Sequence, residues 1–246
     1  MNSDYIDKKM CNVVKGFFIL VVFFSHFQQY VEAAGGWTIN THLGQLIVAM
    51  FLFYSGFGVM ESIKRKGVDY IRSIPKRRVL TTLLNFDVAV LAFIAVDLLT
   101  GQPITLKQSL LSFVCWDSIG NSNWYIFAII CCYALTWVVY GVLRLEKSGV
   151  WLVSMFAGAL ILVLGQVKES WWYDTLLCYP TGMVYSRYRN VIETYVSKHY
   201  WCTLICALVV FLLFRYCGYT IKGFVSNAEA RGFALLIVLL TMKIPI

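Results

Sequence analysis

Two ionisable residues, Lys15 and His26, interrupt the first apolar stretch of the chain. They are eleven positions apart. On an α-helix this spacing is three turns plus about 20°, so both side chains project from one face, about 16 Å apart along the axis. A cation near one end of such a helix can bind a phosphorylated ligand, and an imidazole further along can move a proton. Structural roles are the alternative: Lys15 reaching the lipid headgroups, and His26 hydrogen-bonded to a neighbouring helix.

Two aspartates also fall in apolar surroundings. Asp87 lies midway along the apolar stretch 79–99, where an ionisable group costs about 3 kcal/mol on insertion scales. It either forms a buried ion pair, is protonated because burial disfavours the carboxylate, or is a partner of His26 or Lys15. Asp174 follows two tryptophans and is expected at a membrane interface.

A basic run, Pro75-Lys76-Arg77-Arg78, opens the same apolar stretch. One interpretation is a charge cluster at the cytoplasmic membrane interface. The other is a binding site for phosphates, because guanidinium groups offer paired hydrogen bonds to oxyanions.

The composition requires a lipid environment for these residues. Of 246 residues, 59% are apolar and only 14% are charged, against about 25% charged in soluble domains. This excludes a disordered chain and an ordinary soluble enzyme. The net charge of +8 gathers in short loops, which indicates membrane orientation and no nucleic-acid partner. The cysteines form no C-x-x-C motif, so we expect no metal site.

The apolar stretches predict an all-α integral membrane protein, a single domain over 1–246 with a bundle of about eight transmembrane helices, since each crossing needs about 20 residues. The last of them has only 15 residues. The predicted spans are 13–29, 43–60, 79–99, 124–143, 150–164, 171–185, 200–214 and 232–246. A short interfacial helix is expected over 108–116.

The distribution of bases predicts a cytoplasmic N-terminus. Seven Lys and Arg residues lie between the second and third spans, and none lies in 30–42. By the positive-inside rule the former loop is cytoplasmic. Arg215, Lys222 and Arg231 fall on the predicted outer side, against the rule. We expect an uncleaved first helix in a multi-pass protein of the inner or plasma membrane, with a cleaved signal peptide as the alternative.

Several segments together resemble the membrane-bound acyltransferase-3 family of bacterial O-acyltransferases. A basic residue eleven before a histidine is similar to its opening helix, and Phe51-Leu-Phe-Tyr-Ser55-Gly56-Phe-Gly to its F-F-x-x-S-G-x-G signature. The basic run through Arg78 resembles its segment leading into the third span. Asn123-Trp124-Tyr125-Ile126 resembles its N-x-W-Y/F element, and Tyr179-Pro-Thr-Gly182-Met183 its short glycine-containing span.

The resemblance implies acyl transfer, usually of acetyl, from cytoplasmic acyl-CoA to a hydroxyl of a cell-envelope glycan or lipid-linked sugar. Lys15, Arg77 and Arg78 would bind the CoA phosphates. His26 would act as general base or be acylated as a nucleophile. Acyl-CoA is then a substrate, and no bound cofactor is expected.

Other signature residues have two interpretations. Trp124 and Tyr125 would line the substrate site or anchor a helix at the interface. Ser55 is a candidate polar liner, although Ser55-Gly56 is more typical of close helix packing.

Three departures from the family pattern keep alternatives open. Lys15 stands where the family commonly has Arg, no second Arg follows Arg78 in an R-x-x-R pattern, and the family has about ten spans. A non-catalytic membrane module is therefore one alternative. A transporter or flippase for a glycan or lipid-linked sugar, with His26 and Asp87 relaying protons, is another. Both a monomer and a homo-oligomer stay open.

Overall fold

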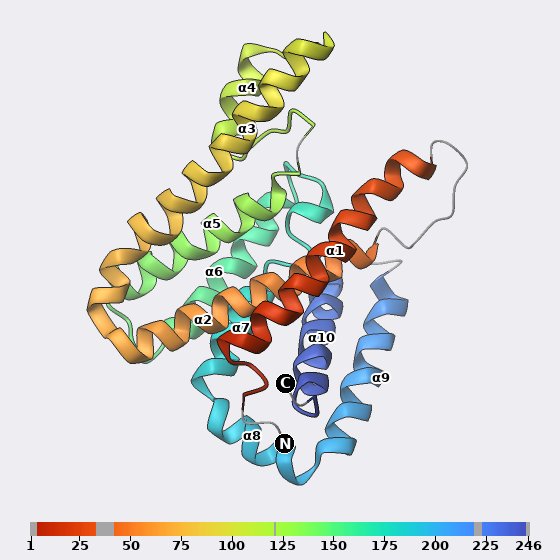
Figure 1. Cartoon of the computed structure of the whole chain (residues 1–246). Coiled ribbons are helices and arrows are strands. Elements are labelled where there is room, and N and C mark those ends of the chain that lie inside the picture. The colour runs from red at the N-terminus through yellow and green to blue at the C-terminus, as the bar shows by residue number, and fades with distance from the viewer. Residues whose placement is uncertain (1–3, 33–41, 121, 219–222, 245–246) are drawn as a thin grey trace. The chain divides into compact units, whose positions relative to one another are not determined.

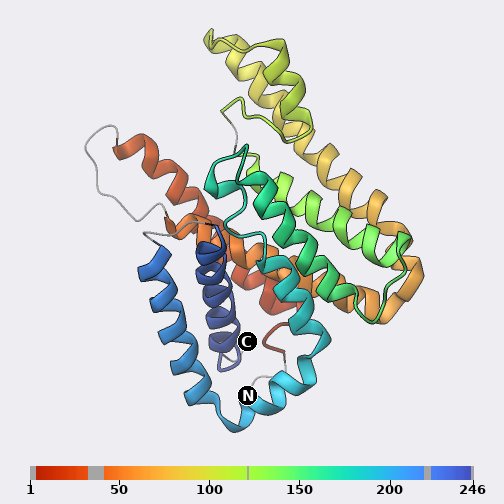
Figure 2. The same ribbon diagram turned by 180° about the vertical axis from the view of Figure 1, so that it is seen from behind.

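The computed structural model describes residues 4–32, 42–120, 122–218 and 223–244 (Figures 1 and 2). Within these ranges the chain forms helices and no strands, which confirms the all-α prediction. Contacts between residues divide the chain into two compact units, one formed by 1–61 with 161–246 and the other by 62–160. The prediction of a single domain over 1–246 stays a prediction.

The first unit contains α1 (Lys8–Glu32), the beginning of α2 (His42–Ile74) and the helices after residue 161. Its later helices are α7 (Cys178–Arg187), α8 (Arg189–Lys198), α9 (Tyr200–Gly218) and α10 (Phe224–Thr241), preceded by the 3₁₀ turn η3 (Ser170–Trp172). The helices α9 and α10 lie side by side (Figures 1 and 2).

Aromatic rings connect three helices of the first unit. Phe233 of α10 stacks on Phe18 of α1 at 6.3 Å between ring centroids and lies 6.1 Å from Phe211 of α9. The apolar face of α10 is therefore buried between its neighbours.

The second unit contains the end of α2, the π-helical η1 (Pro75–Leu80), α3 (Thr81–Thr100), α4 (Leu106–Phe113), α5 (Trp124–Trp137), η2 (Val138–Val142) and most of α6 (Gly149–Leu164). Pro75 begins the wide turn because proline has no N–H to bond into the preceding helix. Thr105 and Gln108 form a capping box at α4, which begins two residues earlier and ends three residues earlier than the helix expected over 108–116. Gly101 ends α3 in the left-handed conformation at φ 70°.

Five helical segments of the described ranges are long and apolar enough to cross a membrane. They are Lys8–Phe27, Leu43–Thr100, Trp124–Val142, Tyr200–Cys217 and Phe224–Thr241. The second, 58 residues long, contains two predicted spans. Between those two lie η1 and Gly67, whose φ of 55° and ψ of −135° are non-helical. The predicted count of eight is not confirmed.

Three predicted spans differ from the structure. Residues 171–185 do not form one helix, because turns separate η3 from the ten-residue α7. The predicted span 150–164 matches α6 (Gly149–Leu164), but the 16 residues of this helix are fewer than the roughly 20 that a crossing needs. The last helix begins at Phe224 and not at 232, so it is 18 residues long. Its polar first turns lower the local hydropathy and hide its start from a search for apolar runs.

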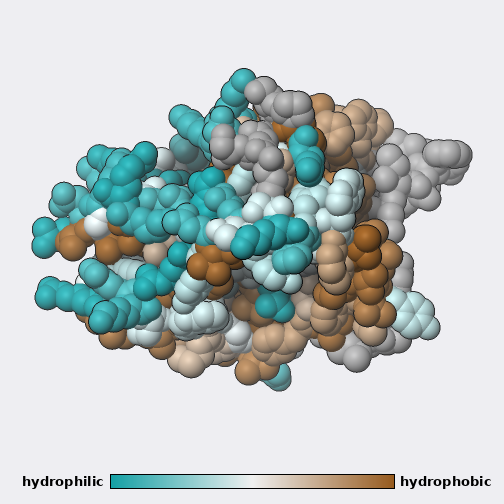
Figure 3. Space-filling model, turned by 90° about the horizontal axis from the view of Figure 1, so that it is seen from below, coloured by the Kyte–Doolittle hydropathy of each residue, from teal (hydrophilic) through white to brown (hydrophobic). Residues whose placement is uncertain are grey.

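Large apolar side chains stay exposed on the candidate spans, as a lipid environment requires. Leu99 of α3 and Trp201 of α9 are exposed by 87% and 68%. Seen from below, hydrophilic and hydrophobic residues gather over different parts of the surface (Figure 3). The prediction of a multi-pass membrane protein is confirmed by these apolar helices. Its inner-membrane location and cytoplasmic N-terminus stay predictions.

Candidate functional site

The helix α1 carries both Lys15 and His26, as predicted. Lys15 is half-buried, and its ammonium lies 5.7 Å from the centroid of the Tyr54 ring of α2. His26 is exposed, and so are Phe23 and Phe27 on the same helix. The unit therefore positions the cation by packing and leaves the imidazole accessible.

A close contact between α1 and α2 lies next to His26. A Cβ atom added to Gly44 would lie only 2.7 Å from Ser25 Oγ. The first turn of α2 thus packs directly against the residue that precedes the imidazole. A side chain at position 44 would require the Ser25 side chain to shift.

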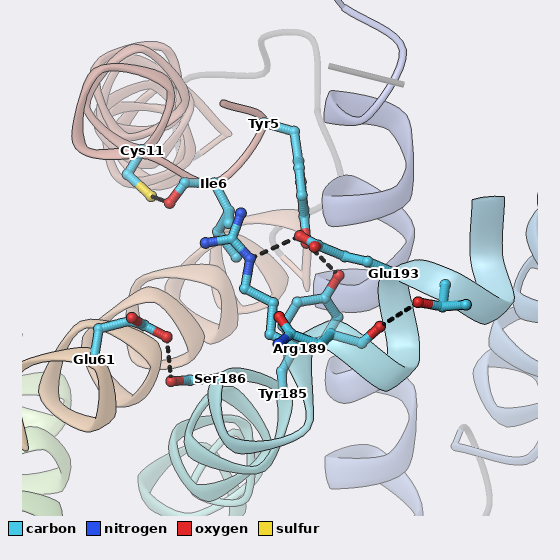
Figure 4. Close-up of polar contacts among 10 residues, drawn as sticks. Tyr5, Ile6, Cys11, Glu61, Tyr185, Ser186, Arg189 and Glu193 are labelled. Atoms are coloured by element: carbon cyan, nitrogen blue, oxygen red, sulfur yellow. Dashed lines mark hydrogen bonds and ion pairs between the residues drawn. The ribbon is translucent and has the colours of Figure 1, made fainter. Parts of the chain in front are cut away.

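The other end of α1 is anchored by the segment before it (Figure 4). Tyr5 is 1% exposed, and its hydroxyl lies 2.7 Å from that of Tyr185 on α7. The Arg189 guanidinium lies 5.6 Å from the centroid of the Tyr5 ring and forms an ion pair with Glu193 at 2.7 Å. Burial and the hydrogen bond with Tyr185 raise the pKa of Tyr5, so its hydroxyl stays neutral.

A second contact of α7 in the same view joins it to α2 (Figure 4). The Ser186 hydroxyl donates to Glu61 Oε1 at 2.7 Å, and Ser186 is fully buried. Together with the Tyr5 contacts, this bond sets how α1, α2 and α7 lie within the first unit. No periodic pattern in the sequence indicates these pairs, because their members are more than 120 positions apart.

Asp174 is buried within the first unit, and its expected position at a membrane interface stays a prediction. It is 7% exposed, and its carboxylate accepts hydrogen bonds from Ser226 Oγ at 2.5 Å, from Gly223 N at 3.3 Å and from Gln45 Nε2 at 3.4 Å. Burial raises the pKa of Asp174, and the bonds from Ser226 and Gly223 act in the opposite direction. The carboxylate joins the beginnings of α2 and α10.

Asn227 completes the connection between α10 and the turn around Asp174. Its Nδ2 donates to the Tyr173 carbonyl at 2.8 Å, and its Oδ1 accepts from Leu177 N at 2.9 Å. Sequence reasoning missed both Asn227 and Ser226. Polar residues immediately before an apolar run are a helix-start signal that could have indicated them.

The side chains of the basic run in the second unit differ in their burial. Lys76 and Arg77 are exposed. Arg78 is half-buried and donates from Nε to the Tyr70 hydroxyl at 3.1 Å, and its guanidinium lies 5.8 Å from the Tyr133 ring centroid. Arg78 therefore joins the end of α2 to α5, while Arg77 presents its charge to the surface.

The remaining predicted site residues also lie in the second unit. Asp87 is half-buried in α3, and its Oδ1 atom is buried with no hydrogen-bond partner among the described residues. Its pairing with Lys15 or His26 stays a prediction. Trp124 and Tyr125 form the half-buried first turn of α5, directly after Asn123, whose Nδ2 donates to the Asp117 carbonyl.

Of the predicted site residues, the first unit therefore positions Lys15 and His26, and the second positions Asp87, Arg77, Arg78, Trp124 and Tyr125. The joint action of the two groups stays a prediction. Across the described ranges, no group of three His, Cys, Asp or Glu side chains could hold a metal ion.

Comparison with known proteins gives one finding. The profile of the acyltransferase-3 family, described as an acyltransferase domain, matches residues 8–243. No curated protein and no solved structure matches the chain.

Proposed function

The chain belongs to the acyltransferase-3 family, and from that premise we propose that it transfers an acyl group, acetyl in the simplest case, from cytoplasmic acyl-CoA to a hydroxyl group. The acceptor is a glycan of the bacterial cell envelope or a lipid-linked sugar. Family membership favours this reaction over the alternative of transport.

The arrangement of α1 is the observation that carries the proposal. Lys15 is held half-buried against Tyr54, while His26, on the same helix, has an exposed imidazole. The rise between them is about 16 Å, which suits a donor whose phosphates and thioester are joined by a long, extended arm. A cation and a base at these two positions match the two ends of acyl-CoA.

In the proposed reaction Lys15, Arg77 and Arg78 bind the phosphates at the cytoplasmic side of the inner membrane. Neutral His26 accepts the proton of the acceptor hydroxyl as its oxygen attacks the thioester carbonyl. The new C–O bond forms, the C–S bond breaks, and the CoA thiolate leaves with the proton returned by the imidazolium. The alternative is that the imidazole attacks first and carries the acyl group.

Three further residues complete the proposed substrate site. Trp124 and Tyr125, at the beginning of α5, line the substrate path, and Asp87 of α3 provides a polar contact along it. Their positions at the first turn of one helix and midway along another are compatible with that role.

The test is the transfer or hydrolysis of radiolabelled acetyl-CoA by the purified protein in detergent. We expect His26→Ala to abolish turnover while membrane insertion is unchanged, because an exposed imidazole contributes little to packing. The matched control is His199→Ala, which removes another exposed histidine of the same unit and should retain turnover. Turnover by His26→Ala would contradict the assignment of the base.

A further inference from the structure

A buried phenol hydroxyl in α2 lacks a hydrogen-bond partner. The Tyr54 side chain is 4% exposed, and its oxygen has no partner among the residues that the structure describes. Buried polar groups are paired in the great majority of cases, and each exception calls for a ligand, a water molecule or a functional reason. A phenylalanine would fill the same space without leaving an unpaired group.

The surroundings of Tyr54 favour an anionic ligand. The Lys15 ammonium lies over the Tyr54 ring at 5.7 Å from its centroid. The Cys11 thiol, on the same helix as Lys15, donates to the Ile6 carbonyl at 3.5 Å. A positive charge and an unpaired O–H donor thus lie together on facing helices.

We propose that the Tyr54 hydroxyl donates a hydrogen bond to a phosphate oxygen of the acyl donor, beside the Lys15 ammonium. This inference rests on the proposed function and assigns to the donor site a residue outside the fixed letters of the family signature. The Lys15 ammonium attracts the phosphate by its charge but does not orient it, because its three N–H donors rotate freely. The phenol, held by the packing of α2, supplies a fixed direction and thereby selects phosphorylated donors.

The variant Tyr54→Phe tests this role because it removes only the oxygen. We expect the KM for acetyl-CoA to rise about tenfold or more, as for the loss of a hydrogen bond to a charged group, with kcat little changed. Thermal stability without ligand should be equal or higher, because no intramolecular bond is lost.

The matched control is Tyr200→Phe. Tyr200 is also a buried tyrosine of the first unit, but its hydroxyl donates to the Leu239 carbonyl at 2.9 Å. Its replacement should lower thermal stability and leave the KM for acetyl-CoA unchanged. An unchanged KM in Tyr54→Phe, with normal His26-dependent turnover by the wild type, would overturn the Tyr54 assignment alone.

Acetyl-pantetheine, which has the thioester arm without phosphates, identifies the contacted group. We expect Tyr54→Phe to leave the KM for this shorter donor unchanged. An equal rise in KM for both donors would overturn the phosphate contact. A wild-type protein that neither binds nor consumes acetyl-CoA would overturn both this inference and the proposed function.

Discussion

Gly56 of α2 and Gly182 of α7 allow the backbones of these two helices to touch. A Cβ atom on Gly56 would clash with the Tyr179 carbonyl, and one on Gly182 would clash with the Phe53 carbonyl. Each glycine therefore faces the backbone of the helix that carries the other. Small residues at such crossings are typical of membrane helices, which pack by close contact. This supports the packing interpretation for Gly56, and the role of Ser55 stays a prediction.

We expect Gly56→Ala and Gly182→Ala each to destabilise the protein, at the upper end of about 1–3 kcal/mol for overpacking, because the obstructing atoms belong to backbone. Thermal unfolding in detergent measures the loss. Gly58→Ala is the matched control, since nothing lies within 4 Å of its added methyl group. It should be neutral or stabilising by up to about 1 kcal/mol. Equal losses for all three variants would contradict the close approach.

Because Arg77 is exposed and Arg78 is half-buried, their replacement should have different effects on acetyl-CoA binding and on stability. We expect Arg77→Ala to raise the KM for acetyl-CoA by about two- to fivefold at low salt, as for an exposed ion contact. This effect should fade at about 1 M salt because the Debye length falls to about 3 Å. Thermal stability should not change, since Arg77 is exposed.

Arg78→Ala should also raise the KM, and in addition lower stability by about 1–2 kcal/mol, because it loses its bond to Tyr70 and its contacts with two rings. Arg65→Ala, another exposed base of the second unit, controls for net charge. An equal rise in KM for Arg65→Ala would show that position does not matter and would contradict the phosphate site.

The buried carboxyl of Asp174 predicts a dependence of stability on pH. Burial raises its pKa, so the folded state binds the proton more tightly than the unfolded chain does. The resulting stabilisation is complete below about pH 4, the ordinary range of a carboxyl group, and is lost as the pH rises through the folded pKa.

Asp174→Asn removes this titration and keeps the shape of the side chain. We expect the Tm of Asp174→Asn to rise relative to the Tm of the wild type as the pH increases from about 4 to about 7. Glu169→Gln, at an exposed carboxyl nearby, should give a curve parallel to that of the wild type. If instead the Tm of the variant falls relative to the Tm of the wild type over this range, the hydrogen bonds lower the pKa of Asp174 by more than burial raises it.

The sequence by itself determined the features that depend on local spacing and composition. The distance between Lys15 and His26 placed both on α1, because helical geometry is set by the chain itself. Hydropathy revealed the apolar helices, and motifs from Lys15 to Met183 indicated the family that the profile matches over 8–243.

Only the tertiary structure decided which side chains meet. Asp174 contacts residues of α2 and α10 that are 129 and 52 positions away, and no local pattern indicates these pairs. The predicted start of α10 was too late because the first turns of this helix are polar, as loops usually are. The structure shows why they are polar: Ser226 and Asn227 bond to the turn before α7. In the sequence Tyr54 is one of several aromatic residues of an apolar stretch. Its ring lies beside Lys15, and its hydroxyl is buried without a partner among the described residues, only because α1 and α2 pack together. No local pattern encodes that contact.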